Sequence, residues 1–482
     1  MDAFSAEVLE RLPLAEAVLR CWQWALDADS LHHIYDRFRG RSYEGVLTFE
    51  TIVAVTSSAL IEHGGSGHQA LIRAEEADSL SASKEAVYGK LRRLPISLST
   101  GFLRVGTQRL AELLPRQKTP PEHLPASLRG MEVLFVDGKK IKQVPRLLKP
   151  VRHVTVSVLG GKTLSALSWN TGLVTAFSAH PDGETSDAPL VPELMSQLNE
   201  DAVPHERLFV EDRQFCDLIQ PAQITARSGD HFLIRYNQKV SFFRDHRMKP
   251  GQGIDPAGCH YVEEWGWIGK PKDSRRRQVR RITLTRLATP EENTPEPVIV
   301  LTDLLDATQY PAVDLLEAYR ARWGIERVFQ QIMEVFHLNN LISTTPEGTV
   351  FQFAFCLLLY NMVQLITQHL AKSQEIPAED ISQENVFYDV RRELTSWTTV
   401  IPATESASPL EPIATAAQLR KRLAQLLKLA WTTRWLKSPP KKKQRPHHDP
   451  THIPGTHTSI FRIIHNIPSA NSQKKSRKKS RQ

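Results

Sequence analysis

Two stretches decide the fold: Val133-Leu134-Phe135-Val136-Asp137 and Leu208-Phe209-Val210-Glu211-Asp212. Each opens with a short apolar run, typical of a strand buried on both faces, and closes on an aspartate. A carboxylate at the end of such a strand is costly unless it is paired or bound to a metal. Strand-end aspartates also occur as helix N-caps, and for either aspartate alone that alternative is equally open. For the two together, the sequence favours a shared hard divalent cation such as Mg²⁺.

The segments around these runs predict a mixed α/β core. Residue patterns typical of strands occur at 132–136, 151–158, 163–169 and 173–179. A predicted helix near 188–198 and a predicted strand at 207–210 follow them. Successive strands followed by a helix and another strand are the order of a ribonuclease H-like core. Residues 236–300 are again strand-like, with glycines and many arginines, and predict an insertion into that core. Helical periods return at 314–338 and 349–371.

The regions before and after the predicted core have the periodicity of helices. Residues 83–93 predict a helix with a serine N-cap and a basic end, which would either contact DNA or pack with its end solvated. We therefore predict an α/β protein whose ribonuclease H-like core is interrupted by a β-rich insertion and flanked by helical regions. The boundaries are 1–128 for a helical N-terminal DNA-binding region, 129–235 and 301–372 for the core, 236–300 for the insertion, 373–436 for a helical C-terminal region, and 437–482 for a disordered basic tail.

Composition excludes several classes of protein. The chain has 482 residues, of which 41% are hydrophobic and 24% charged, as in ordinary soluble proteins. The cysteines show neither a close pair nor a metal-ligand spacing. The N-terminus lacks the basic residues followed by an apolar run that mark a secretory signal peptide. The longest apolar stretch, 351–363, is too short to span a bilayer. We expect a cytoplasmic protein that does not enter a membrane.

Positive charge is concentrated at the C-terminus. The formal net charge is +8, yet residues 437–482 contain twelve Lys and Arg against the single acid Asp449, so the preceding residues carry −3. Such a segment would hold a polyanion in a salt-dependent way. A solubilising terminus without further function is an equally open interpretation.

A third carboxylate follows from helix geometry. At about 100° per residue, Tyr319, Arg322 and Glu326 share the polar face of the helix predicted over 314–338. Solvation alone would explain such a face. Trp323 also lies on the polar side, where a large aromatic needs a partner such as the insertion or a nucleic-acid base.

The predicted insertion combines aromatic and basic residues. Two tryptophans precede a run of arginines, namely Trp265, Trp267, Arg275, Arg276 and Arg277. Aromatic rings can stack on an unpaired base, and arginines can bind the phosphate backbone. A two-tryptophan core for a small sheet is the alternative. The arginine run, which continues to 280–281, is expected to face phosphate rather than to be buried.

These residues resemble a known family. The segment Tyr319-Arg320-Ala321-Arg322-Trp323-Gly324-Ile325-Glu326 matches the first three fixed positions of the Tyr-x2-Arg-x3-Glu-x6-Lys signature of DDE transposases of the insertion-sequence-four family. The resemblance extends to Val136-Asp137-Gly138 and to residues 179–190 and 209–216, and covers roughly 130–370. It departs from the signature at the final lysine, where this chain has Met333.

The resemblance implies a metal-binding catalytic triad of Asp137, Asp212 and Glu326, with Mg²⁺ as cofactor and Mn²⁺ able to substitute. Tyr319 and Arg322 would lie against the phosphates, with Trp323 beside them. The implied reaction is cleavage at transposon ends followed by transfer of the 3′-OH into target DNA, a cut-and-paste route. The implied partners are double-stranded DNA with terminal inverted repeats, target DNA and a second copy of the chain. The alternative is a catalytically silent DNA-binding protein derived from a transposase.

Overall fold

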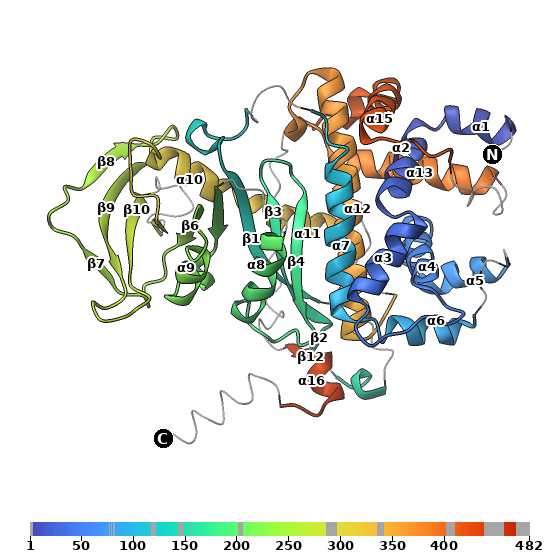
Figure 1. Ribbon diagram of the computed structural model, residues 1–482, viewed down its shortest axis with the longest axis horizontal. Coiled ribbons are helices and arrows are strands. Elements are labelled where there is room, and N and C mark those ends of the chain that lie inside the picture. Colours follow the sequence, from blue (N-terminus) through green and yellow to red (C-terminus); the bar gives the residue numbers. More distant parts are fainter. Residues whose placement is uncertain are drawn as a thin grey trace.

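A mixed sheet lies beside a layer of helices drawn from both ends of the chain (Figure 1). The mixed α/β class expected from the sequence is confirmed. The structure, a computed structural model, describes residues 3–76, 78, 80, 82–116, 122–142, 149–154, 156–200, 206–285, 296–334, 342–401, 410–437 and 457–468.

Within those residues, ten strands form one sheet in the order β4-β3-β1-β5-β6-β11-β10-β9-β7, with β8 paired to β9. β1 is antiparallel to β3, and β3 to β4, whereas β5 is parallel to both β1 and β6. The strands are β1 (Glu132–Ile141), β3 (Gly161–Ser168), β4 (Val174–His180), β5 (Arg207–Glu211), β6 (Asp230–Arg235), β7 (Phe242–Arg244), β8 (Gly251–Ile254), β9 (His260–Ile268), β10 (Arg277–Thr285) and β11 (Val298–Thr302).

The central strands are buried on both faces, as their apolar runs predict. In β1, Val133 and Phe135 belong to the larger core, while Leu134 and Val136 belong to a second core on the opposite face. Helices α7 (Ile96–Ala111), α11 (Trp323–Glu334) and α12 (Pro346–Gln374) cover the first face, and α8 (Val191–Glu200) and α9 (Ile219–Ile224) cover the second.

Helix α12 joins the sheet to the helical layer. It is long and apolar enough to cross a membrane by length and composition, but its apolar window is fully buried inside the protein. The side chain of Asn361 accepts a hydrogen bond from the Val174 N–H at 2.8 Å and donates to the Val174 carbonyl at 2.9 Å and to Thr107 at 2.8 Å. One buried amide therefore connects α12, the first residue of β4 and α7.

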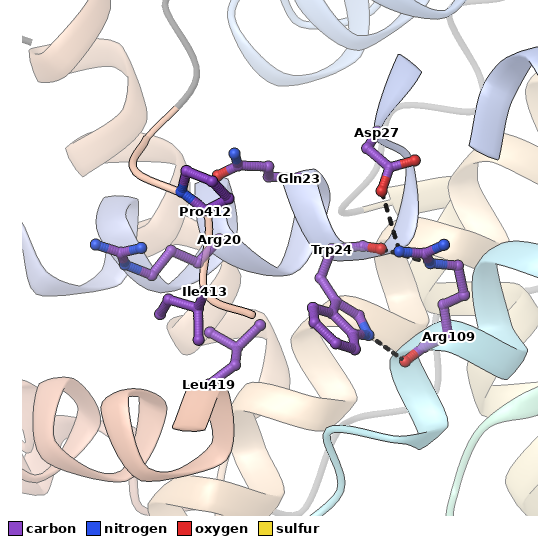
Figure 2. A pocket seen from close by; sticks show the side chains of 8 residues that line it. All are labelled: Arg20, Gln23, Trp24, Asp27, Arg109, Pro412, Ile413 and Leu419. Atoms are coloured by element: carbon purple, nitrogen blue, oxygen red, sulfur yellow. Dashed lines mark hydrogen bonds and ion pairs between the residues drawn. The ribbon is translucent and has the colours of Figure 1, made fainter. Parts of the chain in front are cut away.

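The predicted N-terminal and C-terminal helical regions pack against each other. In Figure 2, Trp24 of α2 donates to the Arg109 carbonyl of α7, and Arg109 pairs with Asp27, beside the segment containing Pro412. Across the same junction, Arg422 binds the buried carboxylate of Glu16 at 2.8 Å. The helices are α1 (Ala3–Glu10), α2 (Pro13–Ala25), α3 (Ala28–Phe38), α4 (Phe49–Ile61), α5 (Gly67–Glu76), α6 (Lys84–Leu91), α13 (Gln383–Val400) and α15 (Ala416–Ala430).

The strand-rich segment predicted over 236–300 extends the main sheet. Strands β7 to β10 lie between β6 and β11 in chain order, and β11 pairs with both β6 and β10. Residues 286–295 of this segment lie outside the described residues.

The segment predicted as a disordered tail contains folded residues. Strand β12 (His457–Ser459) pairs in parallel with β2 (Ser157–Leu159), and α16 (Ile460–Ile464) follows it. The remaining parts of that prediction, 438–456 and 469–482, lie outside the described residues. Composition alone could not indicate this docking, because its partners are some 275 residues earlier in the chain.

Replacing Asn361 by Leu should destabilise the protein by about 2–4 kcal/mol, because the Val174 N–H and carbonyl would be left buried and unpaired. Denaturant unfolding followed by circular dichroism measures this change. The matched control is Gln425→Leu on the exposed side of α15. Equal unfolding midpoints for the two variants would contradict the role given to Asn361.

Candidate active site

Two aspartates meet at one edge of the sheet. Strands β1 and β5 are parallel, and their register pairs Val136 with Glu211. The residues that follow, Asp137 and Asp212, are therefore neighbours across the two strands. By alternation, Asp137 shares the face of Val133 and Phe135, against which α11 packs.

The neighbouring acid Glu211 has a different environment. It is almost completely buried and accepts a hydrogen bond from Gln220 of α9 at 2.7 Å, on the opposite face of the sheet. Burial raises the pKa of the Glu211 carboxyl to about 8, so it is mainly protonated at neutral pH. Of the two adjacent acids, only Asp212 faces the site.

The third acid comes from a helix that is interrupted where it enters the site. The sequence predicts one helix over 314–338, whereas the structure has α10 (Ala312–Ala321) and α11 (Trp323–Glu334), separated at Arg322. Arg322 keeps helical backbone angles and its N–H donates to the Ala318 carbonyl at 3.2 Å, so the helical period expected from the sequence continues across this junction. Glu326 lies in the first turn of α11.

Arg322 contacts two of the three acids. Its Nη1 lies 3.7 Å from Oδ2 of Asp137, and its Nη2 donates to Oε1 of Glu326 at 3.2 Å. The Tyr319 hydroxyl donates to Oδ1 of Asp212 at 3.4 Å, and the Arg322 guanidinium lies 5.8 Å from the Tyr319 ring centre. The structure thus brings together five residues predicted from the sequence: Asp137, Asp212, Tyr319, Arg322 and Glu326.

Arg322 is only 4% exposed, so its guanidinium is directed to carboxylates rather than to an open surface. The predicted contact of Arg322 with DNA phosphate stays a prediction. Trp323, the next residue, is 60% exposed and is available at the surface beside Glu326.

Burial dominates the electrostatics of Asp137. Burial raises the pKa of Asp137 to about 6, although Arg322 and the Gly138 N–H, which donates at 2.9 Å, both act to lower it. The charges of Glu326 and Asp187 raise it further. Carboxyl groups whose pKa is raised toward neutral pH cluster at functional sites.

Gly138 has a physical reason to be glycine. A Cβ at this position would overlap the carboxylate of Asp187 and the ammonium of Lys162, which form a buried ion pair against the strand. The Asp187 side chain makes no capping hydrogen bond at the start of the helix that follows it.

Lys139 was missed by the sequence analysis. It follows Asp137 by two residues in β1 and so lies on the same face. Its ammonium is 5.7 Å from the ring centre of Phe329, one turn after Glu326 on α11. Desolvation lowers the pKa of Lys139, and the charges of Asp137 and Glu326 oppose that shift. The two-residue spacing within a strand is the signal that could have identified it.

The predicted aromatic and basic residues of β9 and β10 do not form one exposed surface. The indole N–H of Trp265 donates to the Leu305 carbonyl at 2.8 Å, and the Arg276 guanidinium covers Trp267 at 4.2 Å. Arg275 is exposed and pairs with Asp273, and Arg277 contacts Thr225 at 3.4 Å.

The expectation that the whole arginine run faces phosphate was wrong for Arg280. This side chain is fully buried and pairs with Glu263 of the adjacent strand β9. The prediction assumed that a buried arginine would have no partner. The carboxylate of Glu263 offsets the cost of burying the Arg280 charge.

The chemistry of the three acids suits a hard divalent cation. Asp137, Asp212 and Glu326 offer carboxylate oxygens, the ligand type of Mg²⁺. Among the residues that the structure describes, no group of three or more His, Cys, Asp or Glu is arranged as a metal-binding cluster. Arg322 instead supplies positive charge between Asp137 and Glu326.

Comparison with known proteins adds independent evidence. Residues 129–362 match the family model described as "Transposase DDE domain". This match supports a DDE transposase. No curated protein matches the chain. Among solved structures, a cryo-EM structure of a piggyBac transposase synaptic complex with hairpin DNA is similar at 9% identity, with 87% of this chain and 85% of that chain covered and a TM-score of 0.35.

Because the pKa of Asp137 is raised from its ordinary value to about 6, ionising this carboxyl destabilises the metal-free fold. The folded state binds a proton more tightly than the unfolded chain, so stability falls as pH rises from about 4 to 6. Asp137→Asn should therefore be more stable than wild type at pH 8, by about 1–3 kcal/mol, and nearly equal to it at pH 4.

Urea unfolding at the two pH values, with chelator present, measures this difference. Asp36→Asn, a change at an exposed residue of α3, is the control. An Asp137→Asn variant that is less stable than wild type at pH 8 would contradict the electrostatic description of the site.

Proposed function

We propose that this protein is a DNA transposase of the insertion-sequence-four type, which cuts DNA at transposon ends and transfers the resulting 3′-OH into target DNA. The observation that carries this proposal is the convergence of Asp137, Asp212 and Glu326 at one edge of the sheet, with Tyr319 and Arg322 in contact with them. The match of residues 129–362 to the transposase domain supports it.

The sheet supports a ribonuclease H-like core. The order β4-β3-β1-β5-β6 has three antiparallel strands followed by two parallel ones. This is the arrangement that the predicted order of three strands, a helix and further strands would give. The first acid lies in the central strand β1, against which α11 packs, and the second follows the parallel strand β5, where Tyr319 of α10 contacts it.

The chain's own residues hold the acids for in-line attack on a phosphodiester. Arg322 holds the carboxylates of Asp137 and Glu326 from one side, and the Tyr319 hydroxyl orients Asp212 from the other. Divalent ions bound by these acids would activate the attacking oxygen and neutralise the leaving oxygen. Mg²⁺ is the proposed ion, with Mn²⁺ able to substitute.

DNA would approach this edge from the side of Trp323. The exposed indole beside Glu326 suits stacking on a base displaced from the duplex, and Lys139 places a cation next to the acids. Terminal inverted repeats, target DNA and a second copy of the chain are the proposed partners. Arg275, at the exposed turn before β10, and the Trp267–Arg276 pair are proposed as further DNA contacts.

The position of Met333 favours a second candidate, a DNA-binding protein without catalysis. Met333 is partly buried and packs against the larger core, so the position where the signature has lysine is apolar here. Lys139 supplies a cation near the position of the missing lysine, because its ammonium contacts Phe329, which lies on the turn of α11 before Met333.

Wild-type protein should nick linear DNA carrying the gene's own flanks when Mg²⁺ is present and should not do so with chelator. Glu326→Gln should lower the rate at least about a hundredfold and leave DNA binding intact, because it removes a metal ligand and no DNA contact. Gel analysis of end-labelled DNA measures both. Glu317→Gln, an exposed glutamate of α10, should cut like wild type. Binding without cutting by wild type would favour the silent DNA-binding protein.

Lys139→Gln should lower the cutting rate by about tenfold or more, because it removes a cation beside the reacting phosphate, whereas Lys139→Arg should keep most of the rate. Single-turnover cleavage with saturating protein measures the step apart from binding. Lys428→Gln, at an exposed position on α15, is the control. Lys139→Gln cutting at the control rate would remove Lys139 from the site.

A further inference from the structure

The strand-rich segment that contains β7 to β10 is held to the connection between β11 and α10. The indole N–H of Trp265 in β9 donates to the Leu305 carbonyl at 2.8 Å. Arg280, which is paired with Trp265 across β9 and β10, donates from Nη1 to the Tyr310 carbonyl at 2.6 Å. The two central strands of this segment therefore fix the chain that leads into α10.

A third contact lies at the far end of α10. Arg320, in the last turn of α10, forms an ion pair with Asp255, in the turn between β8 and β9. Oδ1 of Asp255 accepts hydrogen bonds from the N–H groups of Ala257 at 3.0 Å and Cys259 at 2.8 Å. The turn therefore holds this carboxylate in one place, and its Oδ2 accepts from Arg320.

This pairing differs from an ordinary surface ion pair, which contributes little to stability because both side chains are solvated. The Arg320 side chain is 46% exposed, but the Asp255 side chain is only 1% exposed. Burial acts to raise the pKa of Asp255, yet hydrogen bonds from the Cys259 N–H and from Arg320 lower it below its ordinary value. A buried carboxylate that stays ionised needs its cation, so the position of Asp255 fixes that of Arg320.

Arg320 lies between two residues that contact the acids. Tyr319, which precedes it, donates to Oδ1 of Asp212 at 3.4 Å, and Arg322 lies two residues after it. At about 100° per residue, the side chains of Tyr319 and Arg320 leave α10 in different directions, one toward the acids and one toward the turn between β8 and β9. Hydrogen bonds between hydroxyls and oxygen are usually about 2.5–3.0 Å long, so a small shift of the end of α10 would break the contact of Tyr319.

We propose that Arg320 and Asp255 are positioning residues: their ion pair fixes the last turn of α10 and, with it, Tyr319 and Arg322. This inference rests on the proposed function and gives the strand-rich segment a part in cutting that is separate from contact with DNA. Neither Arg320 nor Asp255 is a catalytic residue, because each acts through Tyr319 and Arg322.

Single-turnover cutting of a duplex carrying the gene's flank, with Mg²⁺ and saturating protein, tests this role. Arg320→Gln and Asp255→Asn should each cut about ten- to a hundredfold more slowly than wild type, because misplacement by about 1 Å can cost about a hundredfold in rate. Their DNA affinities should equal that of wild type. The amide oxygen of Asp255→Asn still accepts from Ala257 and Cys259, so this change removes the ion pair and keeps the turn. Arg320→Lys, which keeps the charge, should recover most of the rate.

The matched controls are Arg247→Gln and Asp245→Asn, which break an ion pair on the surface of the same segment. Both should cut like wild type. The double variant Arg320→Gln/Asp255→Asn should be about as slow as the slower single variant, because both changes remove the same contact. Thermal unfolding checks that each protein is folded.

Two results would overturn the positioning role. The first is cutting by Arg320→Gln and Asp255→Asn at the rates of their controls. The second is slower cutting by Arg320→Gln that follows weaker DNA binding, with Asp255→Asn cutting like its control, because Arg320 would then be a DNA contact.

Mn²⁺ binding without DNA, followed by electron paramagnetic resonance, separates this inference from the proposed function. Because Tyr319 orients Asp212, Arg320→Gln and Asp255→Asn should bind Mn²⁺ about tenfold more weakly than their controls. If wild type binds Mn²⁺ but never cuts, the function is overturned, and weaker Mn²⁺ binding by the two variants still supports the positioning role. If wild type cuts, and the variants cut and bind Mn²⁺ like their controls, the positioning role is overturned and the function is supported.

Discussion

The guanidinium of Arg322 is the contact on which the site depends. It lies between a carboxylate from a β-strand and a carboxylate from a helix, and it is almost fully buried. Without it, the carboxylates of Asp137 and Glu326 would have no cation between them. Arg322 lies at the junction of α10 and α11.

The sheet gives this contact a rigid base. Parallel pairing of β1 with β5 places Asp137 and Asp212 side by side, and burial of both strands on two faces leaves little freedom to change register. Behind them, α12 packs against α11 and is held to β4 by Asn361. Functional groups held on packed strands and helices keep their geometry better than groups on loops. The two terminal helical regions complete the same hydrophobic core.

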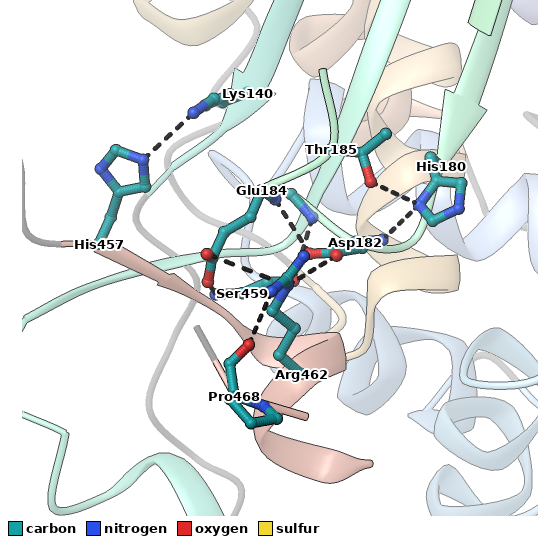
Figure 3. Close-up of polar contacts among 10 residues, drawn as sticks. Lys140, His180, Asp182, Glu184, Thr185, His457, Ser459, Arg462 and Pro468 are labelled. Carbon is teal, nitrogen blue, oxygen red and sulfur yellow. Dashed lines mark hydrogen bonds and ion pairs between the residues drawn. The ribbon is translucent and has the colours of Figure 1, made fainter. Parts of the chain in front are cut away.

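Much of this arrangement follows from the sequence because it is local. The runs before Asp137 and Asp212 predict buried strands, and helical spacing places Tyr319, Arg322 and Glu326 on one side. The features that were missed depend on partners far away in the chain. Arg280 is buried because it forms an ion pair with Glu263 on the neighbouring strand β9. Residues 457–464 dock because Asp182 and Glu184 accept hydrogen bonds from Arg462 and Ser459 (Figure 3).

The most direct test of this account is a crystal structure of the wild-type protein with Mn²⁺, in which anomalous scattering locates the ion. We expect Mn²⁺ to be bound by Asp137, Asp212 and Glu326, with Arg322 moved away from at least one of its two carboxylates to admit the ion. Crystals with Mn²⁺ present but no ion at these acids, and Arg322 still paired to both Asp137 and Glu326, would contradict it.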